Sequence, residues 1–234
     1  MTPTYQRVGY DQTVIPAIVL AAGLSTRMGG RSKALLEIGE GETFLTRIVR
    51  SFQAAAVNDV VVVVGHEADA VRASLGDRGI RLSSVQPAGP PDGVPVDRGV
   101  RVVVNPAYES GQLSSLLAGL NAIDTPGVRA MLMTLVDVPA ASAATIRRVI
   151  DRYHETNAPV VRPVRGDEHG HPVLIDRRLF DELRRADPAE GAKPIVRAYA
   201  SEAGNVAVAD EGAFFDVDTP ADYARLRRGI APRA

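Results

Sequence analysis

The chain contains no cysteine among its 234 residues, which excludes disulfide bridges, thiolate metal sites and cysteine nucleophiles. No apolar run approaches the roughly 20 residues that a helix needs to span a bilayer. An excess of either charge is also missing: 27 basic and 28 acidic residues leave a net charge of −1. Without a global field, neither nucleic acid nor a membrane is expected as a partner, and any cationic chemistry must be local.

The N-terminal stretch, MTPTYQRVGYDQT, lacks the apolar segment of a secretory signal, so we expect a cytoplasmic protein. With 45% hydrophobic and 24% charged residues, the composition is typical of a globular protein, and the length allows a sizeable core. We expect a loose lead-in over residues 1–14 and a single domain over residues 15–230. The stretch 83–99 is rich in proline, glycine and aspartate and has no periodicity, which predicts a flexible insert.

Short apolar runs alternate with segments of helical periodicity in the first half of the chain. We expect buried strands over residues 17–22, 59–65, 100–105 and 130–137, and helices over residues 43–56, 69–75 and 114–123. This alternation implies crossover connections. The predicted fold class is therefore α/β, a Rossmann-like three-layer α/β/α arrangement around a mostly parallel central sheet.

The second half of the chain has shorter, more mixed segments, which suit antiparallel edge strands. We predict strands over residues 158–164, 171–175, 205–209 and 213–217, and helices over residues 177–183 and 193–200. Ser142 is expected to cap a helix, and Thr219 to cap the last helix, with Pro220 in its first turn.

The stretch IVLAAGLSTRMGGRSK, residues 18–33, joins a predicted strand to a loop with three glycines and two separated cations, Arg27 and Lys33. Ligands of open α/β sheets bind beyond the carboxyl ends of strands, and glycine lets backbone N–H groups face an anion. Neither the P-loop nor the G-x-G-x-x-G pattern is present. On its residues alone the loop is either an anion site or an ordinary glycine-rich turn with solvated cations.

The spelling LAAGLSTRMGGRSK closely resembles the signature L-A-A-G-x-S-x-R-M-G-x-x-K of the MobA-like nucleotidyltransferases. It is most similar to the molybdenum cofactor cytidylyltransferase (MocA-type) branch, because the guanylyltransferase branch usually has glycine where this chain has Ala22. The segments 61–66, 105–120 and 214–223 also resemble the family, so the likeness extends over about residues 16–228. It implies the fold of the nucleotide-diphospho-sugar transferases.

The resemblance implies a site for a nucleoside triphosphate, with CTP favoured over GTP. The implied nucleotide-binding residues are Leu20, Ala21, Ala22, Gly23, Ser25, Arg27, Lys33, Gly65, Asn105, Ser114 and Ser115, and the implied catalytic residues are Arg27, Lys33 and Asp137. Taken alone, Asn105-Pro106 indicates a turn, and Ser114 suits a helix cap.

Three aspartates are candidate Mg²⁺ ligands. Asp137 follows an apolar run in TLVDVP, where the family has a similar D-x-P pattern, although Val138 replaces the usual glutamine. Alternation along a strand would place Asp216 and Asp218 on one side, and their stretch is similar to the family's D-x-D-T-P-x-D. Mg²⁺ needs only one or two carboxylates beside phosphates and water, so Asp137 with Asp216 or Asp218 suffices. The alternatives are turn and capping roles.

Two residues are implied as binding the acceptor substrate. His171 lies in Gly170-His171-Pro172-Val173, which matches the family's G-x-P-V, and Lys193 lies in a G-A-K stretch similar to the family's G-A-R/K. A zinc site at His169 and His171 is the competing interpretation, but no third ligand has suitable spacing. A solvated loop and a surface lysine are the plain alternatives.

The function implied is Mg²⁺-dependent transfer of a nucleoside monophosphate, CMP from CTP, to a phosphorylated acceptor such as molybdopterin, with release of pyrophosphate. A sugar or polyol phosphate is the alternative acceptor. A third possibility is a non-catalytic protein that binds the molybdenum cofactor and delivers it to a molybdoenzyme or its chaperone. The three aspartates and Lys33 argue against that role, and the missing G-x-G-x-x-G pattern argues against a redox enzyme.

Overall fold

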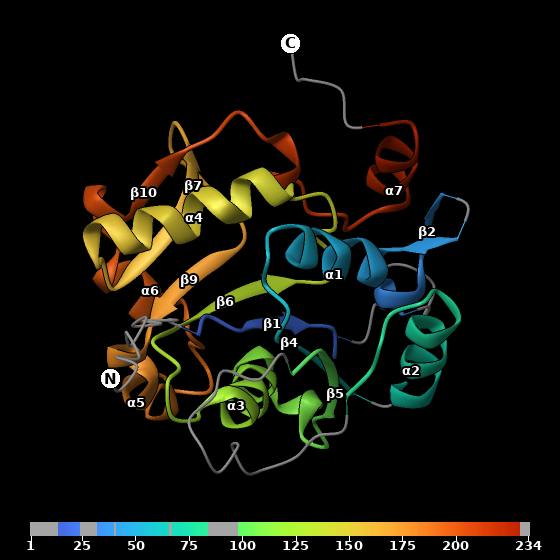
Figure 1. Cartoon of the computed structure of the whole chain (residues 1–234), viewed down its shortest axis with the longest axis horizontal. Helices are drawn as coiled ribbons and strands as arrows, with labels where there is room; N and C mark the ends of the chain where they lie inside the picture. Colours follow the sequence, from blue (N-terminus) through green and yellow to red (C-terminus); the bar gives the residue numbers. More distant parts are fainter. Residues whose placement is uncertain (1–13, 24–31, 40, 66, 84–97, 230–234) are drawn as a thin grey trace, which may run out of the picture.

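The computed structural model describes residues 14–23, 32–39, 41–65, 67–83 and 98–229 (Figure 1). The expected lead-in, Ser25, Arg27 and most of the predicted insert lie outside the described residues. The strands are β1 (Ala17–Leu20), β2 (Glu37–Gly39), β3 (Glu42–Thr43), β4 (Val60–Val64), β5 (Val100–Val104), β6 (Ala130–Leu135), β7 (Val160–Arg165), β8 (Glu168–His169), β9 (Val173–Asp176) and β10 (Asn205–Ala207). The α-helices are α1 (Phe44–Ala54), α2 (Ala68–Asp77), α3 (Gln112–Ile123), α4 (Ala143–Thr156), α5 (Phe180–Arg184), α6 (Lys193–Tyr199) and α7 (Pro220–Arg227).

The central sheet has the strand order β10-β7-β9-β6-β1-β4-β5 in the described part of the chain, with β8 paired to β7. Strands β6, β1, β4 and β5 are parallel to one another, as are β10 and β7. Helices lie on both faces, with α1 and α4 on one side and α3 on the other (Figure 1). The predicted three-layer fold with a mostly parallel sheet is therefore confirmed.

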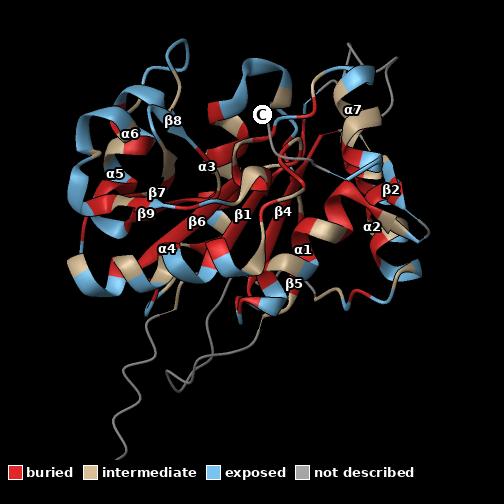
Figure 2. Ribbon diagram, turned by 90° about the horizontal axis from the view of Figure 1, so that it is seen from above, coloured by how far each residue is buried: buried red, intermediate tan, exposed pale blue. Residues whose placement is uncertain are grey.

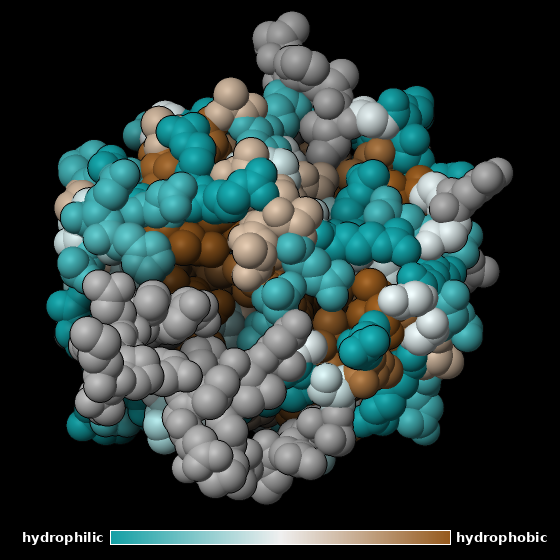
Figure 3. Space-filling model, viewed as in Figure 1, coloured by the Kyte–Doolittle hydropathy of each residue, from teal (hydrophilic) through white to brown (hydrophobic). Residues whose placement is uncertain are grey.

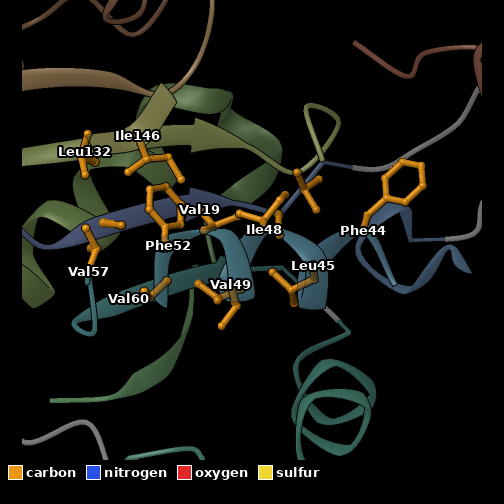
Figure 4. Packing of buried hydrophobic residues seen from close by; sticks show 14 of the residues in the cluster. Val19, Phe44, Leu45, Ile48, Val49, Phe52, Val57, Val60, Leu132 and Ile146 are labelled. Carbon is orange, nitrogen blue, oxygen red and sulfur yellow. The ribbon is translucent and has the colours of Figure 1, made fainter. Parts of the chain in front are cut away.

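The two faces of the sheet carry separate halves of the core, because alternate side chains of a strand point to opposite sides. On β1, Val19 packs with α1 and α4, whereas Ile18 packs with α3. Figure 4 shows Phe52 of α1 beside Ile146 of α4, with Val19 close by. Strands β1, β4 and β9 are buried throughout, and helices α1 and α4 expose their outer sides (Figure 2). On the face seen in Figure 3, hydrophilic residues cover the outside of α4, and hydrophobic ones show in the recesses.

Helix α3 lies very close to the sheet because Gly119 has no side chain. A Cβ at Gly119 would lie 2.7 Å from Cγ2 of Ile18 and 3.0 Å from Cγ2 of Val63. Any side chain at this position would push α3 away from β1 and β4. The position of α3 matters for function, because its first turn borders the site described below.

Three expectations about local structure were wrong. The antiparallel strand β9 lies inside the sheet between β6 and β7 and not at its edge; its residues are all buried, and pairing on both sides gives its backbone N–H and C=O groups their partners. Residues 213–217 do not form a strand: a 3-10 helix at Glu211–Phe214 follows a turn in which Asp210 accepts a hydrogen bond from the Gly212 N–H. Ser114 is not a cap, because α3 begins earlier, after Gly111.

Two predicted helix caps are confirmed. The Ser142 hydroxyl accepts a hydrogen bond from the Thr145 N–H at the start of α4. Thr219 and Asp222 form a reciprocal capping box at the start of α7, with Pro220 in the first turn. The hairpin of β2 and β3 was not anticipated. No helix among the described residues is long and apolar enough to cross a membrane.

A buried ion pair joins two neighbouring strands at the edge of the sheet. The side chain of Arg101 on β5 is 2% exposed, and its guanidinium pairs with Asp59, which directly precedes β4. It also donates to the Ala122 carbonyl oxygen at 2.8 Å, at the end of α3. The pair therefore ties β4, β5 and α3 together at the end of the sheet opposite to the loops that follow β1 and β6.

Replacing Asp59 with alanine would leave the charge of Arg101 buried and uncompensated. We expect Asp59→Ala to lower the free energy of unfolding by about 3–5 kcal/mol, measured by urea denaturation. Asp69→Ala is the matched control, because Asp69 pairs with Arg72 on the exposed surface of α2, where ion pairs contribute little. Equal stability of the two variants would contradict this structural role.

Candidate active site

The parallel strands β1 and β6 end side by side, and the chain leaves their ends in different directions. From β1 the chain crosses outward to β4 and β5, and it then returns past β1 to form β6 on the other side. This reversal of direction creates a crevice at the carboxyl ends of the two strands, which is where open α/β sheets bind ligands. The Ala21 N–H donates to the Val63 carbonyl oxygen and the Val136 N–H to that of Leu20, which fixes the first residues of both loops.

A cavity of about 470 Å³ occupies this crevice. It is bordered by the two loops, the start of α3, the 3-10 turn that precedes α3, and the segment before α7. Its lining residues are Leu20, Ala21, Ala22, Gly23, Lys33, Tyr108, Glu109, Gly111, Gln112, Ser115, Leu135, Val136, Asp137 and Asp218. Seven of the residues expected to bind or process a nucleotide are thus brought together with one of the two late aspartates.

At the centre of this cavity, the Lys33 ammonium lies between two carboxylates. Its Nζ donates to Oδ1 of Asp218 at 2.7 Å and to Oδ2 of Asp137 at 3.2 Å. The Lys33 side chain is only 12% exposed. Burial lowers the pKa of Lys33, but the hydrogen bonds and charges of Asp218 and Asp137 outweigh it, so the pKa lies above its ordinary value. Lys33 is therefore a fixed cation in a mostly covered position.

A backbone hydrogen bond holds the second carboxylate next to the first. The Val217 N–H donates to the Asp137 carbonyl oxygen at 2.8 Å, so the segment before α7 runs beside the loop after β6. Val217 is fully buried, and Asp216 and Asp218 on either side of it are accessible. Residues 216–218 therefore lie outside any strand, contrary to the expectation, and of the two aspartates Asp218 lines the cavity.

Asp216 does not line the cavity, but its charge is coupled to the cavity's carboxylates. Partial burial and the negative charges of Asp137 and Asp218 raise the pKa of Asp216 above its ordinary value, although its side chain keeps an exposed side. Oδ1 of Asp137 is buried and has no hydrogen-bond partner. An orphaned carboxylate oxygen in a site with a second acidic side chain fits a divalent cation, which accepts oxygen ligands.

No group of three or more His, Asp or Glu side chains in the described ranges is arranged to hold a metal ion. The three candidate aspartates are therefore not assembled as a cage, and His169 and His171 do not form part of one. Two carboxylates completed by phosphates and water remain sufficient for Mg²⁺.

Asn105 and Ser114 lie behind the cavity wall and support it. The amide of Asn105 donates to the hydroxyls of Ser114 at 2.8 Å and Ser115 at 3.0 Å, and its Oδ1 accepts from the Ala107 N–H. Ser114 in turn hydrogen-bonds the carbonyl oxygens of Ala107 and Gly111. Ser115 alone of the three lines the cavity, so Asn105 and Ser114 act by shaping the turn before α3.

Two features of the site could not be predicted from the sequence: the contact of Tyr108 with Gly65, and the position of Val138. Tyr108 lines the cavity from the 3-10 turn, and its ring lies directly against Gly65: a Cβ at Gly65 would be 2.9 Å from Cγ of Tyr108. Gly65 thus borders the site indirectly, by allowing the ring to approach. Val138, which departs from the family pattern, is 1% exposed and lines neither of the two cavities described in this section.

A second cavity of about 450 Å³ adjoins the first and shares Leu20, Gln112 and Leu135 with it. Both residues expected to bind the acceptor, His171 and Lys193, line it. The pKa of His171 is lowered by burial, so this ring is neutral at physiological pH. The neighbouring cations Arg162 and Arg197 were not singled out in the sequence. No motif marks them, because they come from β7 and α6, 35 positions apart.

Gly65 offers a direct test of how the cavity wall is built. In Gly65→Ala the methyl group would meet the ring of Tyr108, and we expect a loss of about 1–3 kcal/mol in the free energy of unfolding together with shifted NMR signals of that ring. Gly76→Ala in α2 is the control, since a Cβ there meets nothing within 4 Å and should stabilise the helix. An unmoved Tyr108 signal in Gly65→Ala would contradict this packing.

Comparison with known proteins identifies the family. Residues 17–203 match the MobA-like NTP transferase domain. A molybdenum cofactor guanylyltransferase of Rhodopseudomonas palustris strain HaA2 is 30% identical over 95% of this chain and 95% of its own length. The bifunctional protein GlmU of Brevibacillus brevis is 46% identical over 73% of this chain, and the match covers only 32% of that protein.

A solved structure of similar shape is that of Rv0371c from Mycobacterium tuberculosis H37Rv, with 30% identity and a TM-score of 0.70 over 93% of this chain and 98% of that one. The same protein has been solved in complex with manganese; that structure has 28% identity and a TM-score of 0.64 over 93% of this chain and 100% of that one. The match to the family extends from β1 to the end of α6 and includes Lys33 and Asp137. The chain therefore belongs to the MobA-like NTP transferase family and is a nucleotidyltransferase.

Proposed function

We propose that the chain transfers a nucleoside monophosphate from a nucleoside triphosphate to a phosphorylated acceptor and releases pyrophosphate. The observation that carries this proposal is the Lys33 ammonium held between Asp137 and Asp218 in a cavity at the ends of β1 and β6. A cation and a pair of carboxylates in one crevice match a triphosphate that arrives with a divalent cation. In the sequence Gly23 is followed by Arg27 and two further glycines, which we propose to supply a positive charge and backbone amides to the phosphates.

Each group has a defined part in this reaction. Lys33, Arg27 and the loop amides, beginning with Gly23 and followed by Ser25, would hold the β- and γ-phosphates and the departing pyrophosphate. The backbone of Leu20, Ala21 and Ala22 with Ser115 would border the nucleoside. No protein nucleophile is required, because a phosphate acceptor is already ionised near neutral pH.

The residues fit a resident divalent cation, for which we propose Mg²⁺. Asp137, whose buried Oδ1 has no partner, would hold it together with Asp218 or Asp216. When bound, the ion would neutralise and orient the phosphates of the donor. The manganese complex of Rv0371c supports a divalent cation in a protein of similar fold.

The second cavity is the proposed acceptor site, because it opens beside the first and shares three wall residues with it. Two anions have to meet where the cavities join, and His171 and Lys193 lie on the acceptor side. We favour a molybdopterin-type acceptor, since the curated relatives that match this chain along their whole length are named for the molybdenum cofactor. Delivery of that cofactor without catalysis is the alternative, and it leaves Asp137 and Lys33 without a role.

The base is proposed to be cytosine, because the methyl group of Ala22 lines the cavity where a glycine would leave more room for a purine. GTP is the second candidate, since those same full-length relatives are named guanylyltransferases. The ratio of kcat/KM for CTP to that for GTP distinguishes the two candidate donors.

Loss of the central cation should affect turnover far more than folding. We expect Lys33→Ala to lower kcat for pyrophosphate release by about 10²–10³-fold, since the charge of the phosphates would lose a fixed partner. Arg148→Ala, which removes a cation from the exposed side of α4, is the control and should keep its rate. Thermal unfolding followed by circular dichroism separates loss of rate from loss of fold. A Lys33→Ala variant with the normal rate would contradict the proposal.

Pyrophosphate release with CTP, GTP, ATP and UTP in the presence of Mg²⁺ and molybdopterin tests the donor. We expect CTP to react fastest, and Ala22→Gly to raise kcat/KM for GTP relative to CTP by about tenfold, the range in which one methyl group changes specificity. A wild-type preference for GTP would reject cytosine but not the reaction. No release with any nucleotide, tested also with sugar and polyol phosphates as acceptors, would favour the delivery role.

A further inference from the structure

The second cavity has a charge composition unlike that of the first. Three of its lining residues are basic, Arg162 on β7 and Lys193 and Arg197 on α6, and none of its lining residues is acidic. The first cavity, by contrast, contains Lys33 together with two aspartates and a glutamate. A cavity with cations and no carboxylate is suited to an anion and not to a metal-bound triphosphate.

The two arginines are close enough to repel each other. The pKa of Arg162 is lowered, chiefly by burial and then by the charge of Arg197, and Glu202 opposes this only in part. The Arg162 Nε donates weakly to Oδ1 of Asn205, at 3.4 Å. Within the described ranges, neither arginine lies within ion-pair distance of a carboxylate, although Arg165 on the same strand pairs with Glu168. Repulsion without an internal partner is a cost that a bound anion would remove.

The arginines stand to one side of the proposed reacting centre. Val161, which precedes Arg162, pairs in register with Leu174 of β9, and Leu174 pairs in register with Leu132 of β6. Two strand spacings separate β7 from β6, or roughly 10 Å, and Asp137 lies beyond the end of β6. Leu20, Gln112 and Leu135 connect the two regions. A ligand held by the arginines therefore reaches toward Asp137 across the shared wall.

The floor of the second cavity is apolar. Leu113, Leu116, Met133, Val173 and Val196 line it, and its neutral polar side chains are those of Gln112, His169 and His171. The hydroxyl groups of a sugar or polyol acceptor would be buried in this cavity with few hydrogen-bond partners. Each such unpaired group costs a binding ligand part of its affinity, whereas a flat or apolar body gains from the contact.

We propose that Arg162 and Arg197 form a clamp for an anionic group of the acceptor, and that the apolar floor selects an acceptor body with few hydroxyl groups. The inference rests on the proposed function, because it takes the occupant of this cavity to be the acceptor. It assigns two residues to acceptor recognition, and it separates the two classes of acceptor, those with a flat body and those with a sugar or polyol body.

Binding of two phosphate monoesters with different bodies tests the clamp. Phenyl phosphate and glycerol 3-phosphate are titrated into the ¹⁵N-labelled full chain, with Mg²⁺ and a non-hydrolysable CTP analogue filling the first cavity, and the arginine side-chain N–H signals are followed by NMR. We expect phenyl phosphate to bind at least about fivefold more tightly than glycerol 3-phosphate. Arg162→Gln and Arg197→Gln should each weaken phenyl phosphate binding by about tenfold.

The controls separate recognition from folding and from the nucleotide site. Arg185→Gln removes an exposed arginine at the end of α5 outside both cavities, and it should leave every affinity unchanged. Because Arg162 and Arg197 repel each other, neutralising either should not lower the temperature of unfolding. Affinity for the CTP analogue should also be unchanged in both variants.

Three results would overturn the inference: phenyl phosphate binding that neither substitution weakens, equal or tighter binding of glycerol 3-phosphate, or loss of nucleotide affinity in the arginine variants. Failure of the proposed function looks different. In that case the wild-type chain would bind phenyl phosphate through Arg162 and Arg197 and yet release no pyrophosphate from any nucleoside triphosphate, which supports the clamp and rejects the reaction.

Discussion

The parallel pairing of β1 with β6 is the constraint on which the rest of the site depends. It brings Lys33 within hydrogen-bond distance of Asp137, 104 positions later in the chain, and the hydrogen bond from Val217 to Asp137 adds Asp218, 185 positions after Lys33. On the face that carries Ile18, α3 packs closely against β1 and β4, which Gly119 permits. The same helix begins at the cavity, so one packing contact in the core also fixes the turn that carries Tyr108 and the wall that carries Ser115.

The elements that local chemistry determines could be predicted from the sequence. An all-valine run such as Val60–Val64 predicts a strand buried on both faces. Ser142 and Thr219 accept hydrogen bonds from backbone N–H groups in the first turns of the helices that they cap. Gly23 and Asp137 follow strands whose direction was clear, so their place at the carboxyl ends of β1 and β6 followed as well. These predictions needed only residues that are neighbours in the chain.

What could not be predicted depends on contacts between distant segments. The interior position of β9 results from pairing with both β6 and β7, and the extended segment at Asp216–Asp218 is held by one hydrogen bond to Asp137 rather than by strand propensity. In the sequence Arg162 is a charged residue in a predicted strand and belongs to no motif. Only the fold places it with Arg197 in a cavity lined by no carboxylate. For this reason the family signature marked more residues of the first cavity than of the second.

The division of charge between the two cavities addresses the central difficulty of joining two anions. Carboxylates are present where a divalent cation would accompany the donor, and they are absent where the acceptor is proposed to bind, so the donor would be attracted through its cation and the acceptor through the basic residues of the second cavity. The wall between the cavities is formed by Leu20, Gln112 and Leu135, two of which are apolar, and charge is not screened by water where apolar side chains exclude it. The two substrates would therefore be attracted separately and would meet only at the shared wall.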